Sequence, residues 1–392
     1  MLVNKTFGER YFYLDLIYEK FLPAEDSIRF FARAEEIRQL GKETRDRDLE
    51  LEADLLELSF LIRNNKKDIA HCVALINKLL NIATAEKNNI LLARTHAIAG
   101  DFYWGNNYEK AFEHLHAEYD IIKSMDAEQY PLKQKSLYNL GNCYWFFHDY
   151  TTTMGYMSEA YNTDAFGQNL YYTLQATNTV GLCHQHTGNL DSADYYFQRA
   201  NSIAVTVGND AWDGITSGNI GYDLYLRQQY DKALPLLQKD VELSVKRSDF
   251  GSASGSLIII AEINLANGDI VLARQQAKQA REWVQITGEY GRLKTLYALM
   301  NKLEQQQGNT TLAKHYLDSS VMIKDSLAAK FAALQVVRTA QRGALEKEHE
   351  AAEIMQRMVT VFTSVIALIA IGIIGFSVVR LVMQFRSNGL RA

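Results

Sequence analysis

Apolar residues recur at helical spacing along most of the chain. In the stretch ATNTVGLCHQHTGNLDSADYYFQRANSI, they fall on the faces expected of two helices packed against each other: Val180, Ala193, Phe197 and Ala200. A short polar segment separates the two runs, where Gly188 can end the first helix and Asn189 can cap the second. The pattern therefore predicts a helical hairpin.

Turn-like dipeptides repeat at a fixed interval of 40 residues: Gly188-Asn189, Gln228-Gln229, Gly268-Asp269 and Gly308-Asn309. Small residues keep the same interval: Gly141, Gly181, Gly221 and Ala261. Self-similarity of this length indicates a solenoid of stacked helical hairpins, in which small residues let two helices approach closely. The chain contains only three prolines, which suits an almost wholly helical fold.

One unit carries a full repeat motif: Gly181 in its first helix, then Ala193, Phe197 and Ala200 in its second. This arrangement resembles the tetratricopeptide repeat (TPR) family, whose motif has a small residue followed by alanine, a bulky residue and alanine. The resemblance implies an all-α, TPR-like helical-hairpin solenoid. A HEAT-like or other helical repeat is the alternative.

The other units match the motif in part. The next unit keeps Gly221 but has Asp240 where alanine is usual. In the following unit Ala277 replaces the bulky residue, and the last unit departs at Asn301. An earlier unit is expected around Ala99 and Ala111, with another around Gly141, Thr153, Met157 and Ala160. We therefore expect degenerate helical repeats over residues 1–89 and the TPR-like solenoid over residues 90–325.

The remaining sequence predicts a membrane anchor. Residues 326–357 form a helical or coiled-coil linker with an imperfect heptad pattern, a possible homodimer contact; a single solvated helix is the alternative. Residues 358–379 contain the uncharged run Val359–Val379, which is long enough for one C-terminal transmembrane helix in a lipid bilayer, although a buried core helix is the alternative. Residues 380–392 form a short basic tail.

Composition and motifs narrow the function. The net charge is −5, with 41 basic and 46 acidic residues, and this balance argues against nucleic acid as a partner. We find no catalytic or phosphate-binding motif, so we expect neither an enzyme nor a cofactor. The histidine pairs His114/His116 and His184/His186 are unsuited to chelating a metal alone. The three cysteines form no CxxC pair, which argues against a disulfide framework or a structural zinc site, and Cys143 and Cys183 are expected to be free, buried thiols.

The resemblance also implies a ligand groove on the concave face. Carrying over the family's groove positions gives a set of candidate peptide- or protein-binding residues: Lys135, Tyr138, Asn139, Asn142, Asn178, Asn219 and Tyr222. Their amides can hold an extended peptide by its backbone. The carboxylate clamp of chaperone-binding relatives needs further basic residues, and the corresponding places here hold Ile215, Asn219, Gly255 and Ile259. A solvated face without ligand is the alternative interpretation.

The order of repeats, charged helix and apolar run resembles the sensor half of bacterial TPR-containing membrane histidine kinases, with the kinase module absent. The resemblance implies extracytoplasmic repeats and a cytoplasmic C-terminus. No signal peptide is visible, because Asp15 and Glu19 interrupt the first apolar stretch. The hypotheses are a membrane-anchored interaction module of a signalling system, a complete receptor that acts through a separately encoded kinase or regulator, and a tail-anchored cytosolic adaptor.

Overall fold

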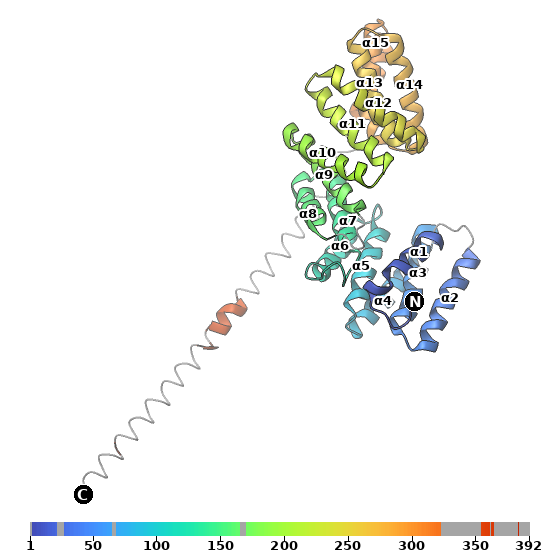
Figure 1. Cartoon of the computed structure of the whole chain (residues 1–392), viewed down its shortest axis with the longest axis vertical. Helices are drawn as coiled ribbons and strands as arrows, with labels where there is room; N and C mark the ends of the chain where they lie inside the picture. The colour runs from blue at the N-terminus through green and yellow to red at the C-terminus, as the bar shows by residue number, and fades with distance from the viewer. Residues whose placement is uncertain are drawn as a thin grey trace. The chain divides into compact units, whose positions relative to one another are not determined.

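The computed structural model describes residues 2–21, 27–64, 68–164, 170–322, 354–360, 362–363 and 383, and these residues form helices joined by turns (Figure 1). The chain divides into two units, Met1–Ala332 and Ala333–Ala392. The helices of the first unit, besides a final helical segment over residues 310–322, are α1 (Phe7–Phe21), α2 (Ser27–Thr44), α3 (Arg47–Asn64), α4 (Ile69–Ala85), α5 (Asn89–Tyr103), α6 (Tyr108–Ile122), α7 (Lys133–Phe146), α8 (Tyr150–Asn162), α9 (Tyr171–His186), α10 (Leu190–Thr206), α11 (Asp210–Leu226), α12 (Tyr230–Lys246), α13 (Phe250–Ala266), α14 (Ile270–Thr287), the short 3-10 helix η2 (Tyr290–Arg292) and α15 (Leu293–Gln306).

These helices pack as consecutive hairpins. Each hairpin joins a first helix to a second helix, in the pairs α5–α6, α7–α8, α9–α10, α11–α12 and α13–α14. Each second helix also packs on the first helix of the next hairpin, although α6 contacts α7 less extensively. Neighbouring first helices also contact one another, in the series α7, α9, α11, α13 and α15. A stack in which one set of helices meets in this way curves toward that set, so we call the surface of these first helices the inner face.

The 40-residue interval is built into the turns. Gly188, Gly268 and Gly308 adopt left-handed backbone conformations with φ near 80°, and Gln228 takes the same place with φ 60°. The interval also extends to His148, with φ 56°, which the sequence pattern did not reveal. A helix ends readily on a left-handed residue, and glycine adopts this conformation without the steric cost of a Cβ atom. The turn positions are therefore confirmed, with Gln228 and His148 as strained exceptions.

The small residues of the motif provide space for a bulky neighbour. A Cβ atom added at Gly181 would lie 2.6 Å from a ring carbon of Phe197, and one added at Gly221 would lie 2.9 Å from Leu237. In the earlier unit, expected around Ala99 and Ala111, both alanines are fully buried, and a Cβ atom added at Gly100 would lie 2.7 Å from Leu115. The hairpin packing is that of a TPR-like helical repeat, as predicted.

The departure from the motif at Asp240 has a structural reason. The side chain is 2% exposed, and its carboxylate accepts hydrogen bonds from the hydroxyl groups of Ser244, Ser252 and Ser256, with the shortest distance 2.6 Å to Ser256. A Cβ atom at Gly218 of α11 would lie only 2.5 Å from Oδ2 of Asp240. Serines and a glycine thus replace the usual alanine contact with a buried polar cluster.

The departure at Asn301 is explained in a similar way. Its side chain lies in α15 and is 9% exposed, and its Nδ2 atom donates to the backbone carbonyl of Ala313, 2.6 Å away. A small residue at this place would leave the two helices in apolar contact alone. The amide instead links α15 to the final helical segment by a buried hydrogen bond. Loss of such a bond is costly, because it leaves a buried polar group without a partner.

The N-terminal helix leaves the regular order of the stack. The Phe7 ring of α1 lies 5.9 Å from that of Tyr130, in the connection between α6 and α7, and 4.6 Å from the Arg94 guanidinium of α5. Arg10 forms a buried ion pair with Asp46, with 3.1 Å between Nη2 and Oδ2. Helix α1 therefore packs on parts of the chain that follow it by several helices.

The predicted membrane segment lies mostly outside the described residues. Most of the linker 326–357, the span 358–379 and the tail 380–392 lie outside the described residues, apart from 354–360, 362–363 and 383. Among the residues that the structure describes, none of the helices combines the length and the apolar character needed to cross a membrane.

Candidate functional site

The predicted groove residues all come from first helices, and they differ in accessibility. Lys135 and Asn142 of α7 are exposed, whereas Tyr138 and Asn139 of the same helix are half-buried. On α9, Asn178 is only 4% exposed. The two residues of α11, Asn219 and Tyr222, are half-buried.

The structure brings two of these amides together. Nδ2 of Asn219 donates to Oδ1 of Asn178, with 2.8 Å between the atoms. This bond occupies the side-chain carbonyl of Asn178, and the residue is buried. Asn178 therefore orients Asn219 and does not itself contact a ligand. By contrast, the side chains of Asn139 and Asn142 have no hydrogen-bond partner within the described part of the chain. These two amides are therefore the ones available for binding.

The two tyrosines contribute aromatic surface to the inner face. The Tyr138 ring lies 5.8 Å from that of Tyr172, and burial raises the pKa of its hydroxyl to about 12. The Tyr222 ring stacks on Tyr225 at 5.9 Å with an interplanar angle of 13°. Burial also raises the pKa of Tyr222, so both groups stay neutral near neutral pH and can act as hydrogen-bond donors.

Consecutive first helices are linked by further polar contacts that the sequence reasoning missed. Glu262 of α13 receives a hydrogen bond from the Tyr225 hydroxyl of α11 and an ion pair from Lys302 of α15, 3.1 Å away. Likewise, Gln185 of α9 donates to Asp223 of α11 at 2.7 Å. Glu262 and Lys302 are separated by one repeat length, 40 residues. Opposite charges at equivalent positions of successive repeats could therefore have indicated this ion pair from the sequence.

One of these residues is a buried acid. Asp223 is 1% exposed, and burial raises the pKa of its carboxyl group to about 6, although the hydrogen bond from Gln185 opposes this shift. Within the described residues its Oδ2 atom has no hydrogen-bond partner. The acid thus lies beneath the inner face and helps to hold α9 against α11.

The side chain of Arg292 lies beside Gly255, a groove position that has no side chain of its own. A Cβ atom at Gly255 would collide with the guanidinium group of Arg292, which pairs with Glu289 at 2.7 Å. Arg292 belongs to η2, just before α15, and so lies outside the repeat register that was used to choose candidates. The inner face therefore carries one more positive group than the motif positions alone predicted.

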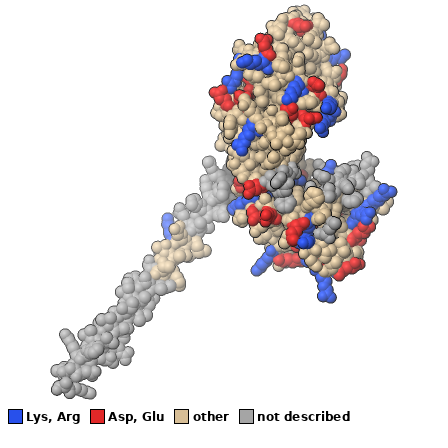
Figure 2. Space-filling view, in the orientation of Figure 1, with Lys and Arg blue, Asp and Glu red and all other residues tan. Residues whose placement is uncertain are grey.

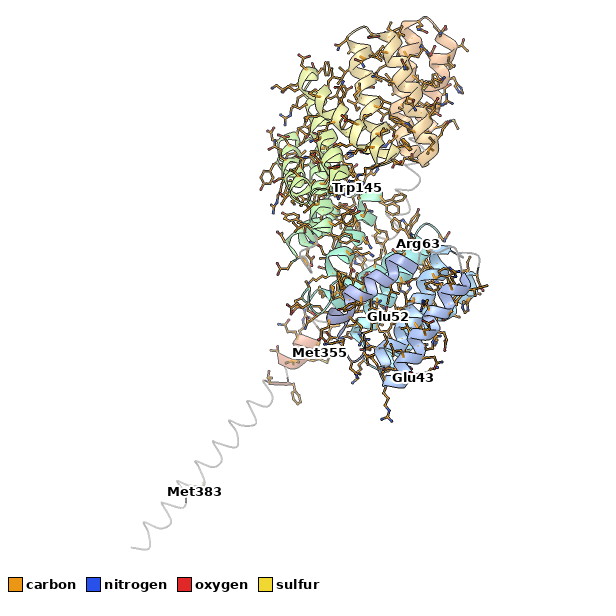
Figure 3. The ribbon with its side chains drawn as sticks, turned by 45° about the vertical axis from the view of Figure 1, so that its right-hand side comes forward. Glu43, Glu52, Arg63, Trp145, Met355 and Met383 are labelled. Atoms are coloured by element: carbon orange, nitrogen blue, oxygen red, sulfur yellow. The ribbon has the colours of Figure 1, made fainter. Side chains whose placement is uncertain are left out.

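A buried acid network holds the N-terminal part of this surface. Glu118 of α6 accepts hydrogen bonds from Tyr130 and Ser136, and burial raises its pKa to about 7. Glu52, labelled in Figure 3, accepts a hydrogen bond from Arg94 with 2.6 Å between Oε1 and Nη2. These groups are buried, so they position helices rather than contact a ligand.

The histidines and cysteines take structural places. His116 pairs with the Tyr144 hydroxyl at 2.8 Å, and His114 lies 2.9 Å from His96 between their Nδ1 atoms. All three cysteines are free: Cys183 is buried as expected, whereas Cys143 is half-buried, and Cys72 is also buried. Among the described residues, no three side chains of the metal-binding types form a group that could hold an ion. On the face shown in Figure 2, acidic and basic side chains are interspersed.

Comparisons with known proteins identify the fold. No protein-family model matches the sequence, and no curated protein matches it. Among solved structures, the chain is similar to the apo form of RapI, with a TM-score of 0.57 and 11% identity over 70% of this chain and 98% of that one. Aspartyl phosphate phosphatase F from Bacillus subtilis has a TM-score of 0.50 and 17% identity, covering 83% of this chain and 95% of its own.

A third similar structure is NprR in complex with its cognate peptide NprX. Its TM-score is 0.50 at 15% identity, over 86% of this chain and 98% of that chain. At such low identities the likeness concerns the fold alone. Together with the glycine-centred hairpins, it shows that the chain folds as a TPR-like helical-repeat solenoid.

Proposed function

We propose that the solenoid is a protein- or peptide-interaction module that holds an extended segment of its partner along the inner face of α7, α9, α11, α13 and α15. The observation that carries this proposal is the row of polar side chains along consecutive first helices. The amides of Asn139 and Asn142 have no hydrogen-bond partner among the described residues, while the Asn178–Asn219 pair continues the row on the next helices. An extended peptide offers backbone donors and acceptors at regular intervals, which such amides can satisfy.

The aromatic residues supply the apolar part of such binding. Tyr138 and Tyr222 are half-buried and packed against other tyrosines, so their rings are held in place before a ligand arrives. Rigid aromatic side chains add contact area at low entropic cost. The NprR structure, which contains the peptide NprX on the same general fold, is consistent with this use of a helical-repeat surface.

We further propose that residues 358–379 anchor the module in a membrane as the sensory or scaffolding part of a signalling system. The proposal rests on the uncharged run Val359–Val379 and the arginines of the tail. We favour extracytoplasmic repeats and a cytoplasmic tail. A reporter fused after Ala392 tests this orientation: activity of a cytoplasmic reporter supports it, and an externally placed reporter contradicts it and the sensor resemblance with it.

Binding is tested with peptides selected from a random display library against the purified full-length protein. We expect the selected peptides to bind wild type and to lose affinity by about tenfold in Asn142→Ala and Tyr222→Ala, since each removes one side-chain contact. Gln198→Ala is the control, because this exposed residue lies on the second helix α10, where its side chain donates to Asp194. Unchanged affinity in both inner-face variants would reject the proposal.

A further inference from the structure

A pocket of about 500 Å³ opens where three first helices end. Tyr225 near the end of α11 and Tyr230 at the start of α12 line one part of it, and Leu265 and Ala266 of α13 provide an apolar part. Its volume is within the range of sites that bind small molecules or single side chains with their flanking backbone. None of its lining residues is among the groove candidates chosen from the motif.

The charged residues of the pocket neutralise each other. Lys302 pairs with Oε1 of Glu262 at 3.1 Å, and the Tyr225 hydroxyl donates to Oε2. The Glu262 side chain is 11% exposed, so its carboxylate is largely committed to these two partners. A cationic ligand would have to displace Lys302, and an anionic ligand would have to draw Lys302 away from Glu262.

The helix ends around the pocket further disfavour an anion. Helices α11, α13 and α15 end at Leu226, Ala266 and Gln306, and the C-terminal end of a helix carries partial negative charge. The carbonyls of Tyr225 and Leu265 near these ends are already bonded to the backbone N–H groups of the turns. The pocket therefore offers no concentrated positive charge to an anion, and its one carboxylate, that of Glu262, is already paired with Lys302.

Two neutral amides complete the lining. Gln305 and Gln306 are exposed, and neither side chain has a partner within the described residues. A side-chain amide can donate to a carbonyl and accept from an N–H at the same time, which matches the pattern of a peptide group. Leu265 and the Tyr225 ring next to them are suited to an apolar side chain.

We propose that this pocket binds one internal, uncharged residue of the ligand: an apolar or aromatic side chain flanked by two peptide groups, not a chain terminus. The inference rests on the proposed peptide-binding function and adds which chemistry the ligand carries at this end of the inner face. Gln305 and Gln306 bind the peptide groups, while Tyr225 and Leu265 contact the side chain.

Three small probes with the same side chain test the inference on the full-length protein. N-acetyl-leucine amide is neutral, N-acetyl-leucine is an anion and leucine amide is a cation, and NMR titration gives a Kd for each. We expect the neutral probe to bind at least about fivefold more tightly than either charged probe. Gln305→Ala should weaken its binding, whereas Gln279→Ala, an exposed residue of α14 bonded to Glu282, should not.

Charge variants give a second readout that a loss of folding cannot imitate. Lys302→Met leaves Glu262 without its cation and should shift the preference toward leucine amide. Glu262→Gln leaves Lys302 without its anion and should shift the preference toward N-acetyl-leucine. If wild type prefers a charged probe or binds none, or if neither variant changes the order of affinities, the inference is wrong.

The proposed function is judged separately by the library-selected peptides. If those peptides still depend on Asn142 and Tyr222 while the probes fail, only the pocket inference falls. If the selected peptides bind without any dependence on the inner face, the proposed function falls as well, whatever the probes show.

Discussion

Replacing Asp240 by alanine restores the residue that the TPR motif has at this position, yet we expect it to destabilise the protein. The motif alone predicts a neutral or favourable change, because alanine packs without burying a charge. The structure predicts the opposite, because three serine hydroxyls donate to this carboxylate and two of them, Ser244 and Ser256, are buried.

The magnitude follows from these bonds and from the cost of burying the carboxylate. A hydrogen bond to a charged group contributes about 1.5–3 kcal/mol, and the serines lose three acceptor contacts with Asp240. Relief of the desolvation penalty and new serine bonds to backbone carbonyls offset part of the loss. We expect a net decrease of about 2–4 kcal/mol in the free energy of unfolding, and a smaller decrease for Asp240→Asn.

Gly218 provides a double-mutant cycle. An added Cβ atom there would lie 2.5 Å from Oδ2 of Asp240, so Gly218→Ala should destabilise wild type by about 1–3 kcal/mol through overpacking. With Asp240→Ala the carboxyl group is gone and only the Cβ atom of residue 240, 2.9 Å from the added Cβ, remains close, so the same change is expected to cost clearly less. The two substitutions should therefore be strongly coupled.

The assay is urea denaturation followed by circular dichroism, combined with hydrogen exchange of segments in α11, α12 and α13. The local measurement matters because repeat proteins can open unit by unit. Asp240→Ala should increase exchange in these three helices more than in α5 and α6. If Asp240→Ala is as stable as wild type, or if the effects of the two substitutions are additive, the buried cluster around Asp240 does not stabilise the protein as described.

Three further predictions concern strain and titration. Gln228→Gly should raise the free energy of unfolding by about 1 kcal/mol in urea denaturation, because Gln228 has a φ of 60° where Gly268 serves in the next unit; no gain would contradict the assigned strain. The pKa of Glu118 is raised by burial from 4.5 to about 7, so its contribution to the free energy of unfolding is full below pH 4.5 and is lost as the pH rises through 7. The loss amounts to about 3 kcal/mol. Glu118→Gln should remove this decline, and denaturation at several pH values would show or exclude it. The pKa of His96 is lowered by burial from 6.5 to about 4, so its contribution to stability is present above pH 6.5 and is lost as the pH falls toward 4. His96→Gln should flatten this acid limb of the stability profile, and an unchanged limb would count against the half-buried pair with His114.

Much of the fold could be predicted because each repeat meets the same packing requirements. Gly181 and Gly221 each face a bulky residue of the second helix of their hairpin, and each turn needs a residue in the left-handed conformation. Small residues and turn residues therefore recur at equal intervals in the sequence. The N-terminal helix could not be placed in this way. Its contacts, such as Phe7 with Tyr130, join parts of the chain that no repeat relates.

The candidate site could be predicted only at the level of helix faces. The repeat register placed Asn142 and Asn178 on first helices, where the structure has them. It did not indicate that Asn142 is exposed, whereas Asn178 is 4% exposed and bonded to Asn219. Such differences depend on how closely neighbouring units approach. Arg292 was missed for another reason, because its side chain enters from a connection outside the register.

Hydrogen exchange with and without a library-selected peptide shows directly whether a partner segment binds along the inner face. Asn142 and Tyr222 place the expected contacts on α7 and α11. Peptide binding is expected to slow exchange in the first helices α7, α9, α11 and α13, and Tyr222→Ala is expected to reduce this protection. Protection concentrated in the second helices α8, α10, α12 and α14 would contradict binding along the inner face.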